Sequence, residues 1–497
     1  MNIPKLHLVN ILFFVFTFNL IYFTSYSQVG IGTVDPDPSS MLEVSSTTQG
    51  MLTPRMSTAQ RLAISEPANG LLVYDLDERA FYYYEANTTS WVSLNSSQEK
   101  RNNFVLVKTL ADFPAPDGSG VITLLSDHYY EVNGTINLEG NTINLNNAYL
   151  SGLDANEDRL FQASGTIFAG STGGSIRQLT LLGGGVLPGS GTGTAFNITG
   201  ATGQRLLLQS TIVANFASVG TLSGLELYFS NIVQYSNNTE GIIYNNIGNL
   251  LLSNQAWFGD SGGTFETLTG TFGLVQKISG FSTVASGATG LDVSSNPSVG
   301  QGVLLSTVFS GDGTYVNGYT TGSYPGFFFN NNWGVECPGL PLEIDAVATG
   351  NVFLRRNTTT DNPTVDINTG PKAIAGVTES TNLFRMGTSA DGIDDNLLVY
   401  EGSNKRTFNF RASLSYQVTT GSTSTIVAFY ISKYSSLGYE IPLGTEVYDE
   451  VNNNTVNSVP LNGTVTLEPG DYIRVFAQRI SGNRNNLRAY SLSFSLD

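Results

Sequence analysis

A short apolar run that closes on an aromatic residue recurs four times in the middle of the chain. The runs begin at Leu206, Leu225, Leu250 and Leu274, so successive starts are 19, 25 and 24 residues apart. Each run leads into a turn rich in Gly, Ser, Asn and Thr, and none sustains a helical period. A repeat of this length built from β-branched and aromatic residues is typical of a β-solenoid. We therefore predict a right-handed parallel β-helix over residues 104–325, with the four leucines stacked as an internal ladder.

Longer runs with strict alternation replace the repeats toward the C-terminus. They cover residues 408–418, 424–434, 464–479 and 487–496. Alternation with a period of two residues predicts antiparallel strands with one face buried, and we expect a jelly-roll sandwich over residues 376–497. Residues 326–375 are expected to connect it to the β-helix. The predicted fold class is all-β, with a small N-terminal module ahead of these two parts.

The N-terminus has the pattern of a secretory signal peptide. Lys5 precedes an apolar run over residues 12–23, and small residues follow at Ser25 and Ser27. This pattern predicts cleavage before Gln28, and the run is too short for a membrane anchor. We expect an exported protein, extracellular or on the cell surface, with no membrane insertion after residues 1–27 are removed.

Residues 28–95 predict a compact module of strands and turns, followed by a polar linker at 96–103. One short helix is expected near residue 60, with Ser57 or Thr58 as its N-cap. The strings VGIGT (29–33), PRM (54–56) and GLLVY (70–74) resemble a module placed after the signal peptide in many exported proteins of Bacteroidetes-type bacteria. The resemblance implies a fibre, tail-spike-like or adhesin region downstream.

Two further segments resemble phage-type tail proteins. Residues 104–140 are similar to the opening of their β-helical regions. Residues 326–497, with NWGVECPGLPLEIDAVATGN and RTFNFRASLSY, are similar to the C-terminal head of tail fibres, which is related in shape to tumour-necrosis-factor-like trimers. The resemblance implies a homotrimer.

One strand of the predicted head suggests where such copies meet. Tyr472, Arg474 and Phe476 share one face of the strand, while Ile473 and Val475 take the other. The aliphatic set is suited to the core, and the aromatic and Arg set is suited to a subunit interface. Ordinary packing within one chain is the alternative.

Composition narrows the range of functions. The net charge of −17 argues against a nucleic-acid partner. Cys337 is the one cysteine, and His128 is the one histidine after the leader, so disulfides, His-based zinc sites and Ser-His-Asp catalysis are excluded. We expect Cys337 to be a small packed residue, and we expect no cofactor.

Parallel β-helices also carry polysaccharide-degrading enzymes, so we searched for paired carboxylates. The acids of the predicted solenoid are Asp154, Glu157, Asp158, Glu226, Glu240, Asp260, Glu266, Asp292 and Asp312. Most lie beside Gly or Asn, where a carboxylate commonly caps a turn. Convergence in one groove would favour an enzyme, and scatter around turns would favour a fibre.

Two sets of residues are candidates for binding. Trp257, Tyr235 and Tyr244 lie on the repeat and could form a sugar-binding platform, although aromatic residues at repeat spacing more often stack inward. Asp391, Asp394 and Asp395 could supply oxygen ligands to Ca²⁺, with a solvated turn as the alternative.

These patterns favour an exported fibre-like adhesin or receptor-binding protein that recognises a surface polysaccharide or another receptor. A secreted lyase or glycoside hydrolase with a groove on the β-helix, and a matrix protein without a ligand, remain as alternatives. No catalytic motif is recognisable.

Overall fold

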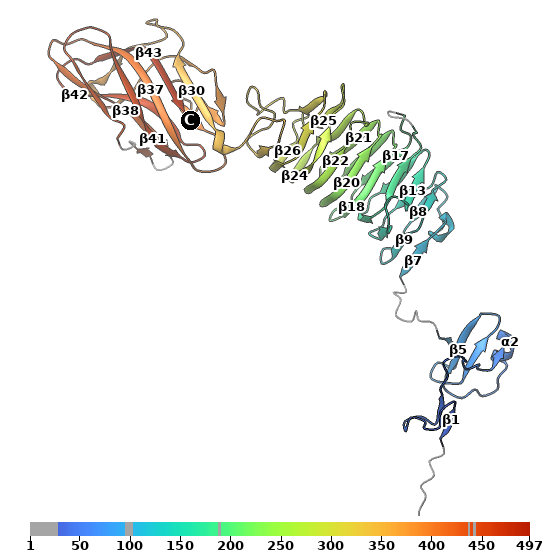
Figure 1. The fold of residues 1–497 in the computed structure, drawn as a ribbon. Helices are drawn as coiled ribbons and strands as arrows, with labels where there is room; N and C mark the ends of the chain where they lie inside the picture. Colours follow the sequence, from blue (N-terminus) through green and yellow to red (C-terminus); the bar gives the residue numbers. More distant parts are fainter. Residues whose placement is uncertain (1–27, 95–102, 187–189, 436–437, 441–443) are drawn as a thin grey trace, which may run out of the picture. The chain divides into compact units, whose positions relative to one another are not determined.

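The structure, a computed structural model, describes residues 28–94, 103–186, 190–435, 438–440 and 444–497. The expected signal peptide and most of the expected linker lie outside the described residues. The described chain falls into two compact units, one on each side of the boundary between residues 101 and 102. Almost all regular structure is β-strand (Figure 1). No described helix is long and apolar enough to cross a membrane.

The N-terminal unit contains two small sheets. One is a parallel pair, β1 (Val29–Ile31) with β2 (Leu42–Val44). The other has the order β3-β4-β5-β6. Its strands are β3 (Arg55–Met56), β4 (Leu72–Asp75), β5 (Ala80–Glu85) and β6 (Ser90–Ser93). Helix α2 (Thr58–Leu62) starts with a capping box in which Ser57 and Gln60 bond to each other's backbone, so the N-cap prediction is confirmed.

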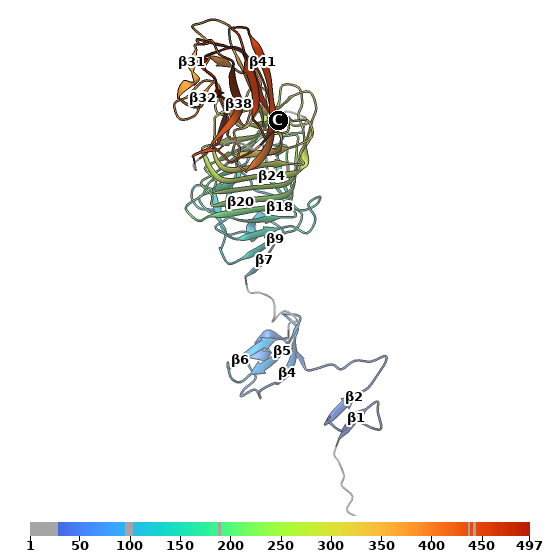
Figure 2. The same ribbon diagram turned by 90° about the vertical axis from the view of Figure 1, so that its left-hand side faces the viewer.

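The second unit begins with a solenoid of parallel strands in three walls. About nine coils stack on one another, and Figures 1 and 2 both show their strands as successive rungs. The first wall contains β7 (Phe104–Val107), β9 (Tyr129–Val132), β12 (Tyr149–Ser151), β15 (Gly174–Arg177), the first halves of β18 (Arg205–Ala214), β20 (Leu227–Ser236), β22 (Asn249–Trp257) and β24 (Thr271–Thr283), then β26 (Ser298–Leu305) and β29 (Trp333–Glu336).

The second wall contains β10 (Thr135–Asn137), β13 (Arg159–Gln162), β16 (Thr180–Gly183), the second halves of the four long strands and β27 (Val308–Ser310). The third wall contains β8 (Val121–Thr123), β11 (Thr142–Asn144), β14 (Thr166–Gly170), β17 (Thr194–Thr199), β19 (Ser218–Ser223), β21 (Glu240–Asn245), β23 (Thr264–Thr269), β25 (Thr289–Asp292) and β28 (Thr314–Asn317). The prediction of a parallel β-helix is confirmed.

Each long strand turns from the first wall into the second at a non-glycine residue with a positive φ. These residues are Ser210, Ile232, Asn254 and Ser279, with φ between 50° and 61°, and in β24 Gly280 follows with a φ of 78°. Such a residue reverses the local pleat without a loop, so each strand lines two walls. Asn tolerates this conformation well, whereas the β-branched Ile232 is strained there.

The internal ladder differs from the predicted one in its register. Backbone pairing stacks Leu206, Tyr228, Leu250 and Val275 in one buried rank. Leu225 is buried but lies before β20, and Leu274 is half-exposed, because its neighbour Val275 points inward. The coils differ in the length of their corners, so aligning the first leucine of each run misplaces two members of the ladder.

The head is a sandwich of two antiparallel sheets. Their central orders are β30-β43-β37-β41 and β36-β42-β38-β40, which is a jelly-roll arrangement, as predicted. The strands are β30 (Thr349–Leu354), β36 (Leu398–Tyr400), β37 (Arg406–Thr419), β38 (Thr425–Ser435), β40 (Val447–Val451), β41 (Asn457–Leu467), β42 (Tyr472–Ser481) and β43 (Asn486–Leu496), with short additions β31 (Val365–Asp366), β32 (Lys372–Ala373), β33 (Thr378–Glu379), β34 (Leu383–Phe384), β35 (Met386–Gly387) and β39 (Gly438–Glu440).

The first strand of the head lies earlier than the alternating pattern indicates. β30 pairs with β43 from within the segment expected to be a connection. It is a single short strand followed by a long loop, so it carries no alternation that a sequence pattern could detect. The head core contains Ile473 and Val475, as expected, and both are fully buried.

Candidate functional site

The three aromatic residues proposed as a sugar platform lie inside the solenoid. Tyr235, Tyr244 and Trp257 have no exposed surface. The rings of Tyr235 and Trp257 stack with centroids 4.0 Å apart, and Phe265 stacks on the other side of Trp257 at 4.9 Å. A buried ring offers no face to a sugar, so the structure corrects the platform hypothesis in favour of the inward stack.

The acidic turn of the head forms ordinary turn contacts. The Asp395 side chain accepts a hydrogen bond from the Thr378 backbone at 3.0 Å, and Asp394 accepts one from the Ser389 hydroxyl at 2.5 Å. Among the described residues, no group of three acidic, His or Cys side chains could hold a metal ion. The contacts of Asp394 and Asp395 are those of a turn, and calcium binding by Asp391, Asp394 and Asp395 stays a prediction.

The proposed interface residues of the head are largely covered within one chain. Tyr472 and Phe476 are 3% and 7% exposed. Tyr472 packs with Leu397 and Val399 and stacks on Tyr434, while Phe476 stacks on Tyr430. Arg474, on the same face, is half-buried. Packing within one chain therefore accounts for the burial of Tyr472 and Phe476 without a partner subunit.

The acids of the solenoid are dispersed. Asp158 accepts backbone N–H groups of Gly134 and Leu153, and Asp260 accepts that of Asn237. Glu226 pairs with Arg205 on the surface at 3.2 Å. Each of these three carboxylates bonds to a separate neighbouring coil, which favours the fibre over an enzyme with two converging carboxylates.

One charged pair lies in the solenoid core. Lys277 Nζ is 2.9 Å from a Glu266 carboxylate oxygen, and both side chains are at most 3% exposed. Lys277 comes from the first wall, and Glu266 comes from the third wall. Burying two charges costs several kcal/mol unless they stay paired, so each partner depends on the other.

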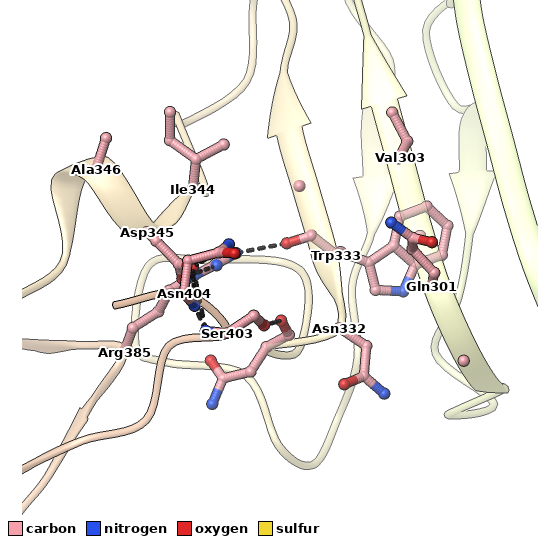
Figure 3. Close-up of a pocket in the computed structure, with 14 residues that line it drawn as sticks. Gln301, Val303, Asn332, Trp333, Ile344, Asp345, Ala346, Arg385, Ser403 and Asn404 are labelled. Carbon is pink, nitrogen blue, oxygen red and sulfur yellow. Dashed lines mark hydrogen bonds and ion pairs between the residues drawn. The ribbon is translucent and has the colours of Figure 1, made fainter. Parts of the chain in front are cut away.

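A cleft lies where the last coils of the solenoid meet the head. Its volume is about 560 Å³. The last coils supply Gly300, Gln301, Gly302, Val303, Asn331, Asn332, Trp333 and Gly334, and the following loops supply Ile344, Asp345, Ala346, Arg385, Ser403 and Asn404 (Figure 3). The lining mixes polar groups, which are amides, a hydroxyl and an ion pair, with the apolar side chains of Val303, Trp333, Ile344 and Ala346.

Arg385 holds the two sides of the cleft together. It is 4% exposed and donates to the Asp345 carboxylate, the Trp333 carbonyl and the Glu343 carbonyl. Its Nε is buried without a hydrogen-bond partner among the described residues. Arg385 also has a positive φ of 53°, an uncommon conformation that its contacts stabilise. The head and the last coil of the solenoid are therefore joined by a cation with several bonds.

Asp345 is the acceptor at the centre of this joint. Besides Arg385, the backbone N–H groups of Ser403 and Asn404 and the Asn404 side-chain amide donate to its carboxylate at 2.8–3.2 Å. Burial opposes ionisation, but the bonds from Arg385 and Asn404 outweigh it and hold the pKa of Asp345 below its usual value. Asp345 stays ionised and engaged with the protein.

Glu343 lies behind the cleft and is almost fully buried. Its carboxylate accepts the backbone N–H groups of Phe328 and Phe329 at 2.9 and 3.0 Å. Burial is the dominant effect and raises the pKa of Glu343 from 4.5 to about 7, although the two N–H bonds and nearby Arg385 oppose the shift.

The side chains of the cleft that can meet a ligand are neutral. The Gln301 side chain is exposed and is one of those that line the cleft (Figure 3). Asn332 uses its amide nitrogen on the Val299 carbonyl, which leaves its oxygen available. Because Asp345 is the one acid among the lining residues and is already ion-paired, the cleft can bind polar, uncharged groups but offers no carboxylate pair for hydrolysis.

Sequence reasoning missed this cleft because its residues span positions 300–404 and no motif links them. Two local signals exist. The Asn run at residues 330–332 interrupts an otherwise apolar stretch, and Arg385 is a lone charge between Phe384 and Met386.

The N-terminal unit leaves most of its apolar residues uncovered. Val29, Ile31, Leu42 and Val44, on the β1–β2 pair, are 42–56% exposed, and Leu52 is 77% exposed. A two-stranded sheet with no covered face is not stable on its own in water. The unit therefore needs another surface against it.

Residues 30–106 match the family model of the phage tail like trimerisation region. The match to a trimerisation region supports a homotrimer. Together with the β-solenoid, it indicates a fibre-like structural or receptor-binding protein similar to phage tail fibres.

No curated protein matches the chain. Two solved structures show limited likeness, each at 10% sequence identity over 30% of this chain. They are Eiger TNF from S. frugiperda, covered over 91% of its chain with a TM-score of 0.22, and murine APRIL, covered over 98% with a TM-score of 0.19. TM-scores this low carry no argument about fold or function.

Proposed function

We propose that the protein is an exported, homotrimeric fibre that binds a neutral surface glycan in the cleft between the solenoid and the head. The observation that carries the ligand proposal is the lining of that cleft. Gln301 and Asn332 present amide groups, while the Asn404 amide, the Ser403 hydroxyl and the one ion pair are engaged within the protein. Sugars are recognised by such arrays of neutral donors and acceptors, and a rigid joint reduces the entropy lost on binding.

Export is proposed from the leader-like segment at residues 1–27, and a fibre that binds a surface glycan would act outside the cell or on its surface. The trimer would present three clefts on one particle. Multivalent presentation converts weak single-site binding into strong adhesion when the receptor is a repeating polymer.

The test uses the full chain on an array of neutral and acidic oligosaccharides. Wild-type protein should bind neutral glycans, and the double variant Gln301→Ala/Asn332→Ala should bind them about thirtyfold more weakly, because it loses two hydrogen bonds worth about 1 kcal/mol each. Thr267→Ala, on the third wall, is the matched control and should bind like wild type. Unchanged binding by the double variant would exclude the cleft, and no binding by wild type to any glycan would refute the proposed ligand.

A further inference from the structure

One side of the cleft is formed by β26 and β29, the last two strands of the first wall. Val303 of β26 pairs with Gly334 of β29, and the Gly302 backbone N–H donates to the Asn332 carbonyl at 2.9 Å. Side chains alternate along a strand, so Gln301 and Val303 share the outer face of β26 while Gly302 faces the core. Gln301 therefore lies beside Asn332, one step of this face before Val303 and Gly334.

These two neighbouring rungs differ in chemistry. Gln301 and Asn332, which we call the polar rung, carry exposed amide side chains. Val303 and Gly334, which we call the apolar rung, carry no polar side-chain atom. Two residues along a parallel strand span about 6.6 Å, so the rungs lie about that far apart. A ligand group that contacts both rungs must have a hydrogen-bonding end that matches an amide and an apolar end.

The other apolar side chains of the cleft are also small. Ile344 and Ala346 add two aliphatic groups to the lining, one half-buried and one exposed. Trp333 is 1% exposed, so its ring face is not available to stack on a sugar. Among the described lining residues, apolar contact therefore comes from aliphatic side chains, which suit a methyl group better than the broad face of a sugar ring.

Gly334 leaves room for such a group. A Cβ atom added to Gly334 would have no other atom of the described protein within 4 Å. Gly334 lies within β29 and is not among the glycines with a positive φ, so its backbone conformation does not require glycine. The missing side chain instead keeps the space beside Val303 open to a ligand.

We propose that the neutral glycan of the proposed function, on which this inference rests, carries an acetamido group that lies across the two rungs. The acetamido N–H donates to Asn332 Oδ1, because the Asn332 amide nitrogen already donates to the Val299 carbonyl at 2.8 Å. The acetamido carbonyl accepts from the Gln301 amide, and the methyl group lies over Gly334 against Val303. A hydroxyl at the same position of the sugar would leave one amide unpaired and Val303 without an apolar contact.

The test measures binding of the full chain to neutral glycans in matched pairs. The members of a pair differ only in a 2-acetamido or a 2-hydroxyl group, as triacetylchitotriose and cellotriose do. Wild-type protein should bind the acetamido member about tenfold more tightly, because the hydroxyl member lacks the methyl contact and one hydrogen bond. Gly334→Val fills the open space and should abolish this preference. Thr267→Val places the same side chain on the third wall, outside the cleft, and should retain it.

The outcomes separate the two proposals. Equal binding of both members of the pairs, or binding confined to deoxy sugars, would overturn the acetamido inference and leave the proposed function intact. No binding to any neutral glycan would refute the proposed function, and the acetamido inference with it. A preference that persists in Gly334→Val would overturn the placement of the group across the rungs. Val303→Thr keeps the shape of the side chain but adds a hydroxyl, so it should also lower the preference and provides a second variant if Gly334→Val fails to fold.

Discussion

Replacing Glu343 by glutamine should abolish a pH dependence of stability that arises at the joint between the solenoid and the head. Burial raises the pKa of this carboxyl from 4.5 to about 7. The folded protein therefore binds the Glu343 proton more tightly than the unfolded chain does, and raising the pH favours unfolding. The contribution is complete below about pH 4.5, falls as the pH rises through 7, and is absent above it.

The size of the effect follows from that shift. A change from 4.5 to about 7 corresponds to about 3 kcal/mol lost between pH 4.5 and pH 8. The glutamine side chain has one oxygen, which can accept the backbone N–H group of Phe328 or of Phe329, and its NH2 group then faces the other N–H group. It therefore has its own cost, but that cost does not vary with pH.

The assay is urea unfolding of the full chain between pH 5 and 8, followed by tryptophan fluorescence, since Trp333 lies in the same joint. The difference in unfolding free energy between wild type and Glu343→Gln should change by about 3 kcal/mol across this range. Glu336 is an exposed acid on β29, so Glu336→Gln is the control. Its unfolding free energy should change with pH in the same way as that of wild type. A difference between wild type and Glu343→Gln that stays constant with pH would refute the reasoning.

Two further predictions concern the solenoid. Ile232→Asn should raise the unfolding free energy by about 1 kcal/mol, because it replaces a half-exposed β-branched residue at a φ of 55°. Asn254→Ile, at the equivalent bend of β22, should lower the unfolding free energy by a similar amount. Urea unfolding of both variants measures these changes, and changes of the same sign would contradict the role of the bend. Lys277→Met should destabilise the protein by about 3–5 kcal/mol, because it leaves Glu266 charged and buried. The double variant Lys277→Met/Glu266→Met should recover most of that loss. Equal melting temperatures for the single and double variants would contradict this prediction.

The parts of the fold that depend on local patterns could be predicted from the sequence. The apolar runs and their turns indicated a parallel solenoid, and the alternating strands of residues 408–496 indicated the sandwich, because each pattern reflects which side chains face a core. The stacking of Leu206 on Tyr228 could not be predicted, since it depends on the number of residues in each corner. The alternation in β42 did identify Ile473 and Val475 as core residues.

The candidate site depends on contacts that no local pattern records. Arg385 reaches Asp345, which is 40 positions away, and the Trp333 carbonyl, which is 52 positions away. The aromatic residues at Tyr235 and Trp257 show the converse limit. Their spacing was visible, but whether they faced inward or outward was decided by a register that only the folded coils define.

The mass of the full chain in solution tests the account most directly. Sedimentation equilibrium of the exported protein should give three times the mass of one chain. Ile31→Asp together with Val44→Asp, which place charges on the uncovered β1–β2 pair, should weaken that assembly. A wild-type protein that sediments with the mass of a single chain at every concentration would contradict the trimeric fibre.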